Sequence, residues 1–285
     1  MKKIAVLGAG LMGHGITQVA TQIGKFEVYM RDIEQRFIDN GMTMIRESLQ
    51  RFVKKGQMTE TQMNETLARI HPTLDLKEAV STADLIIEAA PENIELKKAL
   101  FREVDNYAPE HAIIASNTSS VSITELASAT KRPQKVCGMH FFNPPQLMKL
   151  IEVIRGAQTS DETTQTILEV ARRMEKETVL VKKDCPGFIV NRILIPALNE
   201  AAAIYWEGTA DRDDIDKAIK LGLNWPMGPL MLLDYIGSDT TLAIAEVLTK
   251  ELDPKFHPST GLKQMVKAQL LGRKTGKGFY DWTQR

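Results

Sequence analysis

A histidine and a glutamate lie on either side of a proline-containing turn near the middle of the chain. His140 ends an apolar, strand-like run, and Glu152 lies inside a second apolar run. The Asn-Pro-Pro turn at 143–145 can continue neither a helix nor a central strand, so we expect the two runs to fold back as a hairpin with His140 opposite Glu152. Facing strand residues have Cβ atoms about 5 Å apart, which allows a carboxylate to hydrogen-bond an imidazole. Such a pair is typical of a general base, although a single histidine in an apolar run is more often a packing residue.

A glycine-rich loop follows the first strand-like run of the chain. Residues 2–7 lead into Gly8-Ala9-Gly10-Leu11-Met12-Gly13, a helix-period segment, and a second short strand before Asp32. In this order the pattern indicates a dinucleotide site, because the glycines allow a tight turn and bring backbone amides and a helix N-terminus to a pyrophosphate. A glycine-rich turn without a ligand is the alternative. The expected cofactor-binding residues here are Gly8, Gly10, Leu11, Met12, Gly13 and Asp32.

The acidic residue after the second strand favours NAD over NADP. The Asp32 carboxylate can accept hydrogen bonds from the ribose hydroxyls and would repel a 2′-phosphate. Arg31 is adjacent, and an arginine in this region can accommodate that phosphate. NADP therefore stays the less favoured alternative.

Strand-like and helix-like segments alternate through residues 1–185, which predicts a Rossmann-like, mostly parallel sheet with right-handed crossovers. Ligands of such sheets bind beyond the carboxyl ends of the strands. Glu92, Asn117, Ser119 and His140 all fall at these ends. The polar helical pattern over about 34–68 predicts a helical hairpin inserted into this domain. Its first arm is either a solvated face or an anchoring site for a phosphorylated substrate handle.

The pattern changes after Cys185, and residues 186–285 lack strand alternation. We expect helices over 188–207, 211–221, 230–251 and 259–271, separated by joints that contain Gly and Pro. The apolar faces of these helices predict an all-α C-terminal domain that packs against a partner as well as around its own core.

Composition limits the class of protein. The 285 residues carry 36 basic and 36 acidic side chains, and the absence of a net charge argues against a nucleic-acid binder. The two cysteines form neither a disulfide framework nor a C-x-x-C metal pair. No apolar run is long enough for a membrane span. We therefore expect a soluble cytoplasmic protein without a metal site.

Several motifs in this order resemble the 3-hydroxyacyl-CoA dehydrogenase family, and within it the short bacterial 3-hydroxybutyryl-CoA dehydrogenases. The similarity covers essentially the whole chain. It rests on the glycine loop and on the sequences at 116–120 (SNTSS), 140–144 (HFFNP), 186–192 (PGFIVNR), 226–229 (PMGP) and 272–280 (GRKTGKGFY).

The resemblance implies an NAD-dependent enzyme that interconverts (S)-3-hydroxybutyryl-CoA, or a related short-chain 3-hydroxyacyl-CoA, and acetoacetyl-CoA by hydride transfer. It implies a homodimer formed through the C-terminal helical domain. It also implies roles for individual residues: His140 as catalytic acid or base with Glu152 as its orienting acid; Ser119 and Asn191 at the reacting oxygen and thioester end of the substrate; Asn143 beside the histidine, in contact with cofactor and substrate; Glu92, Lys97 and Asn117 at the nicotinamide half of the cofactor; Ser48 and Lys55 at coenzyme A.

Two other classes of function are weighed against this one. An NAD-binding redox sensor would not need an acid opposite His140, and it would often carry a basic DNA-binding element. A dehydrogenase for a free hydroxy acid would need a cationic clamp for a carboxylate and would have no use for Ser48 and Lys55. An assay with acetoacetyl-CoA beside free acetoacetate separates these hypotheses.

Overall fold

The computed structural model describes residues 1–283, and the chain divides into two compact units, Met1–Cys185 and Pro186–Arg285. The division falls where the sequence pattern changes from alternating strands and helices to helices alone. The first unit is an α/β domain, and the second is helical.

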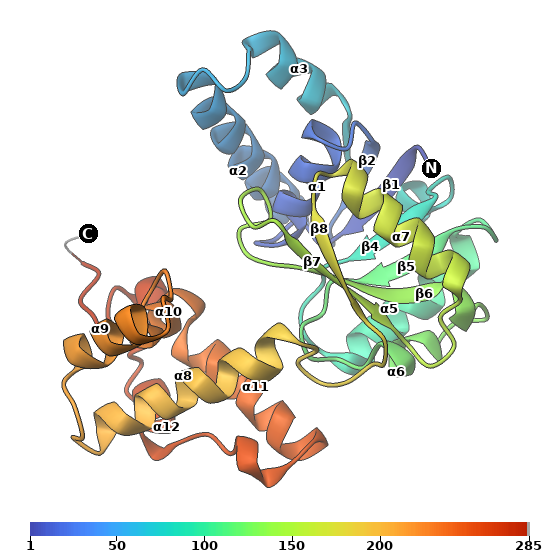
Figure 1. Ribbon diagram of the computed structural model, residues 1–285. Helices are drawn as coiled ribbons and strands as arrows, with labels where there is room; N and C mark the ends of the chain where they lie inside the picture. Colours follow the sequence, from blue (N-terminus) through green and yellow to red (C-terminus); the bar gives the residue numbers. More distant parts are fainter. Residues whose placement is uncertain (284–285) are drawn as a thin grey trace. The chain divides into compact units, whose positions relative to one another are not determined.

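An eight-stranded sheet forms the centre of the first unit, with the strand order β3-β2-β1-β4-β5-β6-β7-β8 (Figure 1). Every neighbouring pair is parallel except β6 and β7, which confirms the predicted mostly parallel sheet. The sequence pattern does not predict β3, an edge strand that contains Pro72, which is tolerated only at an edge. The strands are β1 (Lys3–Leu7), β2 (Glu27–Arg31), β3 (Ile70–Thr73), β4 (Leu85–Glu88), β5 (Ile113–Ser116), β6 (Val136–Phe141), β7 (Leu150–Arg155) and β8 (Glu177–Val181).

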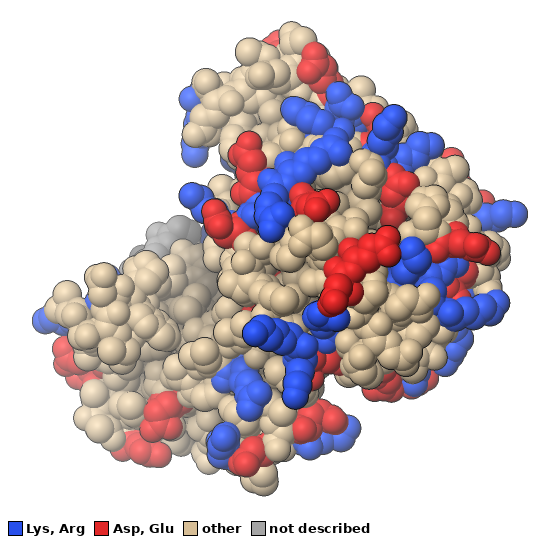
Figure 2. Space-filling view, turned by 45° about the vertical axis from the view of Figure 1, so that its right-hand side comes forward, with Lys and Arg blue, Asp and Glu red and all other residues tan. Residues whose placement is uncertain are grey.

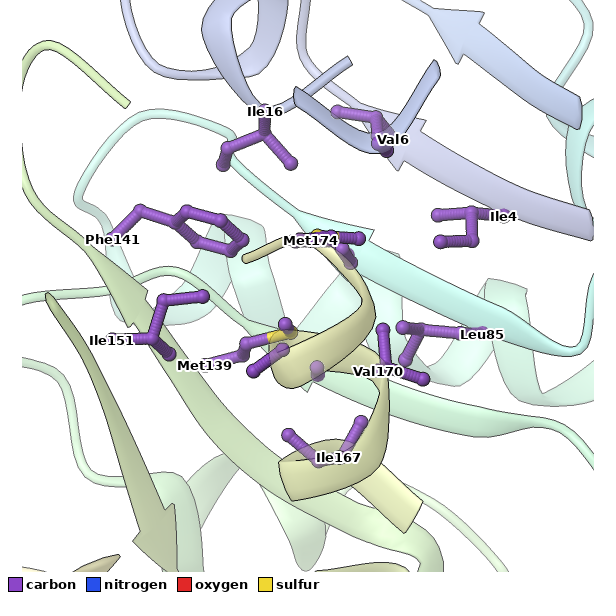
Figure 3. Close-up of a cluster of buried hydrophobic side chains, with 14 of the residues drawn as sticks. Ile4, Val6, Ile16, Leu85, Met139, Phe141, Ile151, Ile167, Val170 and Met174 are labelled. Atoms are coloured by element: carbon purple, nitrogen blue, oxygen red, sulfur yellow. The ribbon is translucent and has the colours of Figure 1, made fainter. Parts of the chain in front are cut away.

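Two layers of helices cover the sheet. In the largest core cluster, Ile16 of α1 and Ile167 and Val170 of α7 pack against strand residues such as Val6 and Met139 (Figure 3). In Figure 1, α5 and α6 lie on the opposite side of the sheet from α7, and α5 contacts both α4 and α6. The helices of this unit are α1 (Gly13–Gln22), α2 (Gln35–Lys54), α3 (Glu60–Ala68), α4 (Leu76–Val80), α5 (Ile94–Tyr107), α6 (Ile123–Ala127) and α7 (Asp161–Arg173), with a short 3₁₀ helix η1 (Pro133–Lys135).

Helices α2 and α3 form the helical hairpin predicted for residues 34–68, which is thereby confirmed. The apolar face of α2, with Ile38, Ile45 and Leu49, packs on Met30 and Ile70 of the sheet edge. Thr59 and Gln62 cap each other's backbone N–H groups and fix the start of α3. Met63 and Leu67 of α3 pack against the same cluster, so both arms anchor the hairpin to the sheet.

The second unit consists of α8 (Val190–Trp206), α9 (Arg212–Gly222), α10 (Pro229–Ile236), α11 (Ser238–Glu251) and α12 (Thr260–Lys267), with short 3₁₀ helices η2 (Pro254–Phe256) and η3 (Arg273–Thr275). The single helix predicted over 230–251 is wrong. Gly237, with φ of 104°, ends α10 and starts α11. A positive φ of this kind is accessible to glycine and interrupts the helical hydrogen bonds.

The distribution of charge on the visible face agrees with the balanced composition. Basic and acidic side chains are interspersed over the face shown in Figure 2. Among the helices of residues 1–283, none is both long and apolar enough to cross a membrane.

Candidate active site

The predicted pairing of His140 with Glu152 is confirmed. Strands β6 and β7 pair in antiparallel register with His140 directly opposite Glu152. The His140 Nδ1 lies 2.8 Å from Glu152 Oε2, and the two residues are 6% and 0% exposed. A carboxylate this deeply buried holds the imidazole in one orientation, because water cannot replace it as a partner. A carboxylate can only accept a hydrogen bond, so Nδ1 carries the proton that is donated to Glu152, and Nε2 is the second nitrogen of the ring.

The ends of β4 and β5 converge beside β6, as expected for the carboxyl edge of a parallel sheet. Asn117 follows β5, and its Oδ1 accepts a hydrogen bond of 2.9 Å from the backbone N–H of Phe141, the residue after His140. Ser119 donates its backbone N–H to Glu92 Oε1 at 2.8 Å, while its hydroxyl makes a longer contact of 3.4 Å with the same atom. The structure thus brings Glu92, Asn117 and Ser119 together at the edge of the sheet that carries His140.

Lys97 lies fully buried between two carboxylates at this edge. Its Nζ is 2.6 Å from Glu88 Oε1 and 3.1 Å from Glu92 Oε2. Burial, the largest single influence, would raise the pKa of Glu92, but the Lys97 ammonium and hydrogen bonds from Thr118 and Ser119 together lower it below its ordinary value. Glu92 therefore stays ionised at neutral pH.

Sequence reasoning missed Glu88. Its carboxylate accepts hydrogen bonds from Lys97, from the backbone N–H of Ala90 and from the hydroxyl of Ser116, each at 2.6 Å. Glu88 thereby ties the loop after β4 to the end of β5. The signal in the sequence is a carboxylate as the last residue of an otherwise apolar strand.

The glycine loop has the shape that a pyrophosphate requires. Gly8 has φ of 111°, and a Cβ on Gly13 would lie only 1.7 Å from the carbonyl oxygen of Gly8. By contrast, a Cβ on Gly10 would meet no atom within 4 Å, so open space faces this residue at the start of α1. Asp32 Oδ2 accepts a 2.7 Å hydrogen bond from the Ala9 N–H. Leu11, in the loop, is 60% exposed, and Met12 forms the N-cap of α1. These residues fit a dinucleotide.

A cavity of about 630 Å³ lies between α2 and the loop of residues 142–149, which joins β6 to β7 and is called here the proline loop. Ser48, Lys55 and Asn143, three residues expected at the substrate, all line it. Arg51 lines the same cavity and adds a second cation. Asn191 is the second residue of α8, in the second unit.

Comparison with known proteins now places the chain in a class. The model of the 3-hydroxyacyl-CoA dehydrogenase NAD binding domain matches residues 3–185, and that of the 3-hydroxyacyl-CoA dehydrogenase C-terminal domain matches residues 187–282. The fold and the glycine loop accordingly define an NAD-binding oxidoreductase. The chain belongs to the 3-hydroxyacyl-CoA dehydrogenase family.

Its relatives include full-length bacterial proteins. A probable 3-hydroxybutyryl-CoA dehydrogenase of Deinococcus radiodurans is 50% identical over 281 residues, which cover 98% of this chain and 100% of the relative. The 3-hydroxybutyryl-CoA dehydrogenase of Clostridioides difficile is 46% identical over 283 residues, or 99% and 100% of the two chains. The crystal structure of (S)-3-hydroxybutyryl-CoA dehydrogenase from Ralstonia eutropha superimposes with a TM-score of 0.94 at 43% identity, covering 99% of each chain.

Proposed function

We propose that this protein interconverts (S)-3-hydroxybutyryl-CoA and acetoacetyl-CoA, with His140 and Glu152 as the acid–base pair and NAD as the redox partner. The observation that carries the proposal is the 2.8 Å contact between His140 Nδ1 and buried Glu152 Oε2. The pair lies at the same sheet edge as Asn117 and the Lys97–Glu92 pair. The relatives named for this reaction cover the whole chain.

His140 acts on the oxygen at C3 of the substrate. The glycine loop and Asp32 would hold NAD, which when bound would supply the acceptor for the hydride of C3, or as NADH its donor. In oxidation, the Nε2 of His140 takes the proton of the 3-hydroxyl group as the C–H bond breaks. In reduction, the imidazolium donates that proton to the 3-keto oxygen. Glu152 stabilises the imidazolium and keeps Nδ1 protonated throughout.

We assign further polar residues to the substrate and the cofactor. The Ser119 hydroxyl has only a 3.4 Å contact with Glu92, which leaves it available to the reacting oxygen. Asn143 is exposed on the wall of the cavity, and we assign it to both cofactor and substrate. Asn191 is assigned to the thioester end. Lys97, Glu92 and Asn117 are assigned to the nicotinamide half of the cofactor.

The cavity beside α2 suits the coenzyme A handle. Its volume of about 630 Å³ is that of a typical small-molecule site. Lys55 and Arg51 supply positive charge for phosphate groups, and Ser48 supplies a hydroxyl. The polar face of the hairpin is in this proposal a binding surface rather than a solvated one.

NAD rather than NADP is proposed as the cofactor. Asp32 directly follows β2, and its carboxylate lies at the glycine loop, where it would repel a 2′-phosphate. The Nε of Arg31 donates to the carbonyl of Leu74 at 3.2 Å, so this guanidinium is engaged by the protein itself.

A homodimer through the second unit is also proposed. Large apolar side chains remain exposed there, among them Ile193 (69%), Leu221 (76%) and Leu223 (61%). Exposed apolar groups in such numbers are typical of a subunit interface. Light scattering of the purified protein, with Leu221→Glu as the disruptive variant, tests this assembly.

The decisive experiment follows NADH oxidation with acetoacetyl-CoA and with free acetoacetate, and then repeats the first reaction with NADPH. Rapid turnover of acetoacetyl-CoA with NADH alone supports the proposal. Equal turnover of free acetoacetate would remove the role of the coenzyme A cavity, and equal turnover of NADPH would remove the role of Asp32.

A further inference from the structure

A buried lysine outside the catalytic pair holds the proline loop. Lys176 lies between α7 and β8 and is 7% exposed. Its Nζ donates to the carbonyl of Pro145 at 2.6 Å and to that of Met148 at 2.7 Å. Among the described residues, no carboxylate forms an ion pair with it. Burial lowers the pKa of this lysine.

The local backbone directs this side chain inward. Glu175 has φ of 56°, and the backbone N–H of Lys176 bonds to the carbonyl of Ala171 at the end of α7. This left-handed turn ends the helix, and the next residue, Lys176, directly precedes β8. The N–H of Glu177 then pairs with the carbonyl of Lys149, at the end of the proline loop.

The opposite side of the proline loop rests on α1. Pro145 is buried against Gly15, where a Cβ would lie 2.8 Å from the proline ring. Gln146 donates from Nε2 to Gln18 Oε1 at 3.0 Å. The loop is thus held between the cofactor-binding helix on one side and the Lys176 ammonium on the other.

The outer face of the same loop lines the substrate cavity. Asn143, Gln146 and Leu147 face that cavity, while the carbonyls of Pro145 and Met148 face Lys176. An apolar side chain at 176 would leave both carbonyls without their donor, and a loop of this kind would then shift to recover hydrogen bonds.

We propose that Lys176 is a positioning residue for the reaction, which sets the place of the proline loop and so of Asn143 relative to His140 and the acyl-CoA. This inference rests on the proposed function. It assigns to Lys176 a larger effect on acyl-CoA than on the cofactor, because the glycine loop forms the pyrophosphate site and the proline loop lines the substrate cavity. If Lys176 were only a structural residue, its replacement would lower the stability of the protein and leave substrate binding unchanged.

The test compares Lys176→Met with Lys131→Met, the same substitution at an exposed lysine of the same unit. We expect Lys176→Met to lower kcat/KM for acetoacetyl-CoA by about 10- to 100-fold, mostly through KM, since a misplacement of about 1 Å can cost that much. The affinity for NADH, measured by fluorescence titration, should change much less than KM, because the glycine loop that holds the pyrophosphate is not touched by the substitution. Lys176→Arg keeps the charge and the hydrogen-bond donors, so its KM should lie close to the wild-type value.

A stability control separates position from folding. Ile167→Val removes a core methyl group, so it lowers the melting temperature without touching the loop. The proposal is overturned if Lys176→Met leaves KM at the Lys131→Met value, or if Ile167→Val raises KM as much at a similar melting temperature. If Lys176→Met does not fold, the shorter neutral donor of Lys176→Gln is measured in its place, with the same criteria. Wild-type protein that fails to reduce acetoacetyl-CoA would refute the proposed function instead.

Discussion

Replacing Glu152 by glutamine tests the centre of the proposed mechanism. Glu152 is 0% exposed, and glutamine has nearly the same shape, so the substitution creates no cavity in the core around β7. It removes the negative charge 2.8 Å from His140 Nδ1. The amide can also present its N–H₂ group to Nδ1, which would place the ring proton on Nε2 and leave that nitrogen unable to accept a proton.

The size of the effect follows from the burial of this contact. A hydrogen bond to a charged group contributes about 1.5–3 kcal/mol, and here no water can substitute for the lost partner. At about 1.4 kcal/mol for each factor of ten, the stabilisation of the imidazolium accounts for about 10- to 150-fold in rate. Truncation of the base itself, His140→Ala, should cost about 10²- to 10⁴-fold.

The assay measures kcat/KM with acetoacetyl-CoA and NADH, and with (S)-3-hydroxybutyryl-CoA and NAD⁺. The enzyme does not alter the equilibrium constant, so both values should fall by the same factor. The matched control is Glu27→Gln, which breaks a second histidine–glutamate pair, His71 Nε2 to Glu27 Oε2 at 2.9 Å, on the partly exposed edge of the sheet. A Glu152→Gln enzyme as active as Glu27→Gln would refute the role of the buried acid.

Further predictions concern the cofactor loop, the coenzyme A cavity and the cysteines. The added Cβ of Gly10→Ala meets no atom, so this variant should fold normally but bind NADH more weakly. The Cβ of Gly13→Ala would lie 1.7 Å from a backbone carbonyl oxygen, so this variant should fail to fold stably. Thermal unfolding and NADH titration of both variants distinguish these outcomes, and equal stability of the two would refute the reasoning. Lys55→Met should raise KM for acetoacetyl-CoA and leave KM for the same acyl group on pantetheine unchanged, since only the full coenzyme carries the distal phosphates; an equal rise for both would exclude phosphate recognition. Burial raises the pKa of Cys137 to about 12, so iodoacetamide should modify the half-buried Cys185 in the native protein and reach Cys137 only after unfolding; mass spectrometry before and after denaturation checks this.

The order of strands, helices and the glycine loop along the chain made much of the fold predictable. The glycine loop lies between β1 and α1, and the strand–helix alternation specifies a parallel sheet through rules that act on neighbouring elements. The His140–Glu152 contact was predictable for the same reason, because the two residues are 12 apart across a single turn and hairpin pairing fixes which residues face each other. The long helix predicted over 230–251 failed because Gly237 ends one helix and starts the next, a choice that its φ of 104° reveals and its residue type only permits.

The sequence by itself therefore determined the class of fold, the dinucleotide loop, the paired histidine and glutamate and the family. Only the tertiary structure decided which residues support them. Ser116 bonds Glu88 across 28 residues, and Lys176 holds the carbonyl of Pro145 across 31. No local pattern marks these partners, since each contact exists only after a crossover helix, α5 or α7, has brought two distant segments to one edge of the sheet. A buried lysine looks in sequence like any surface lysine, and only its surroundings show that its ammonium is placed to hold a loop.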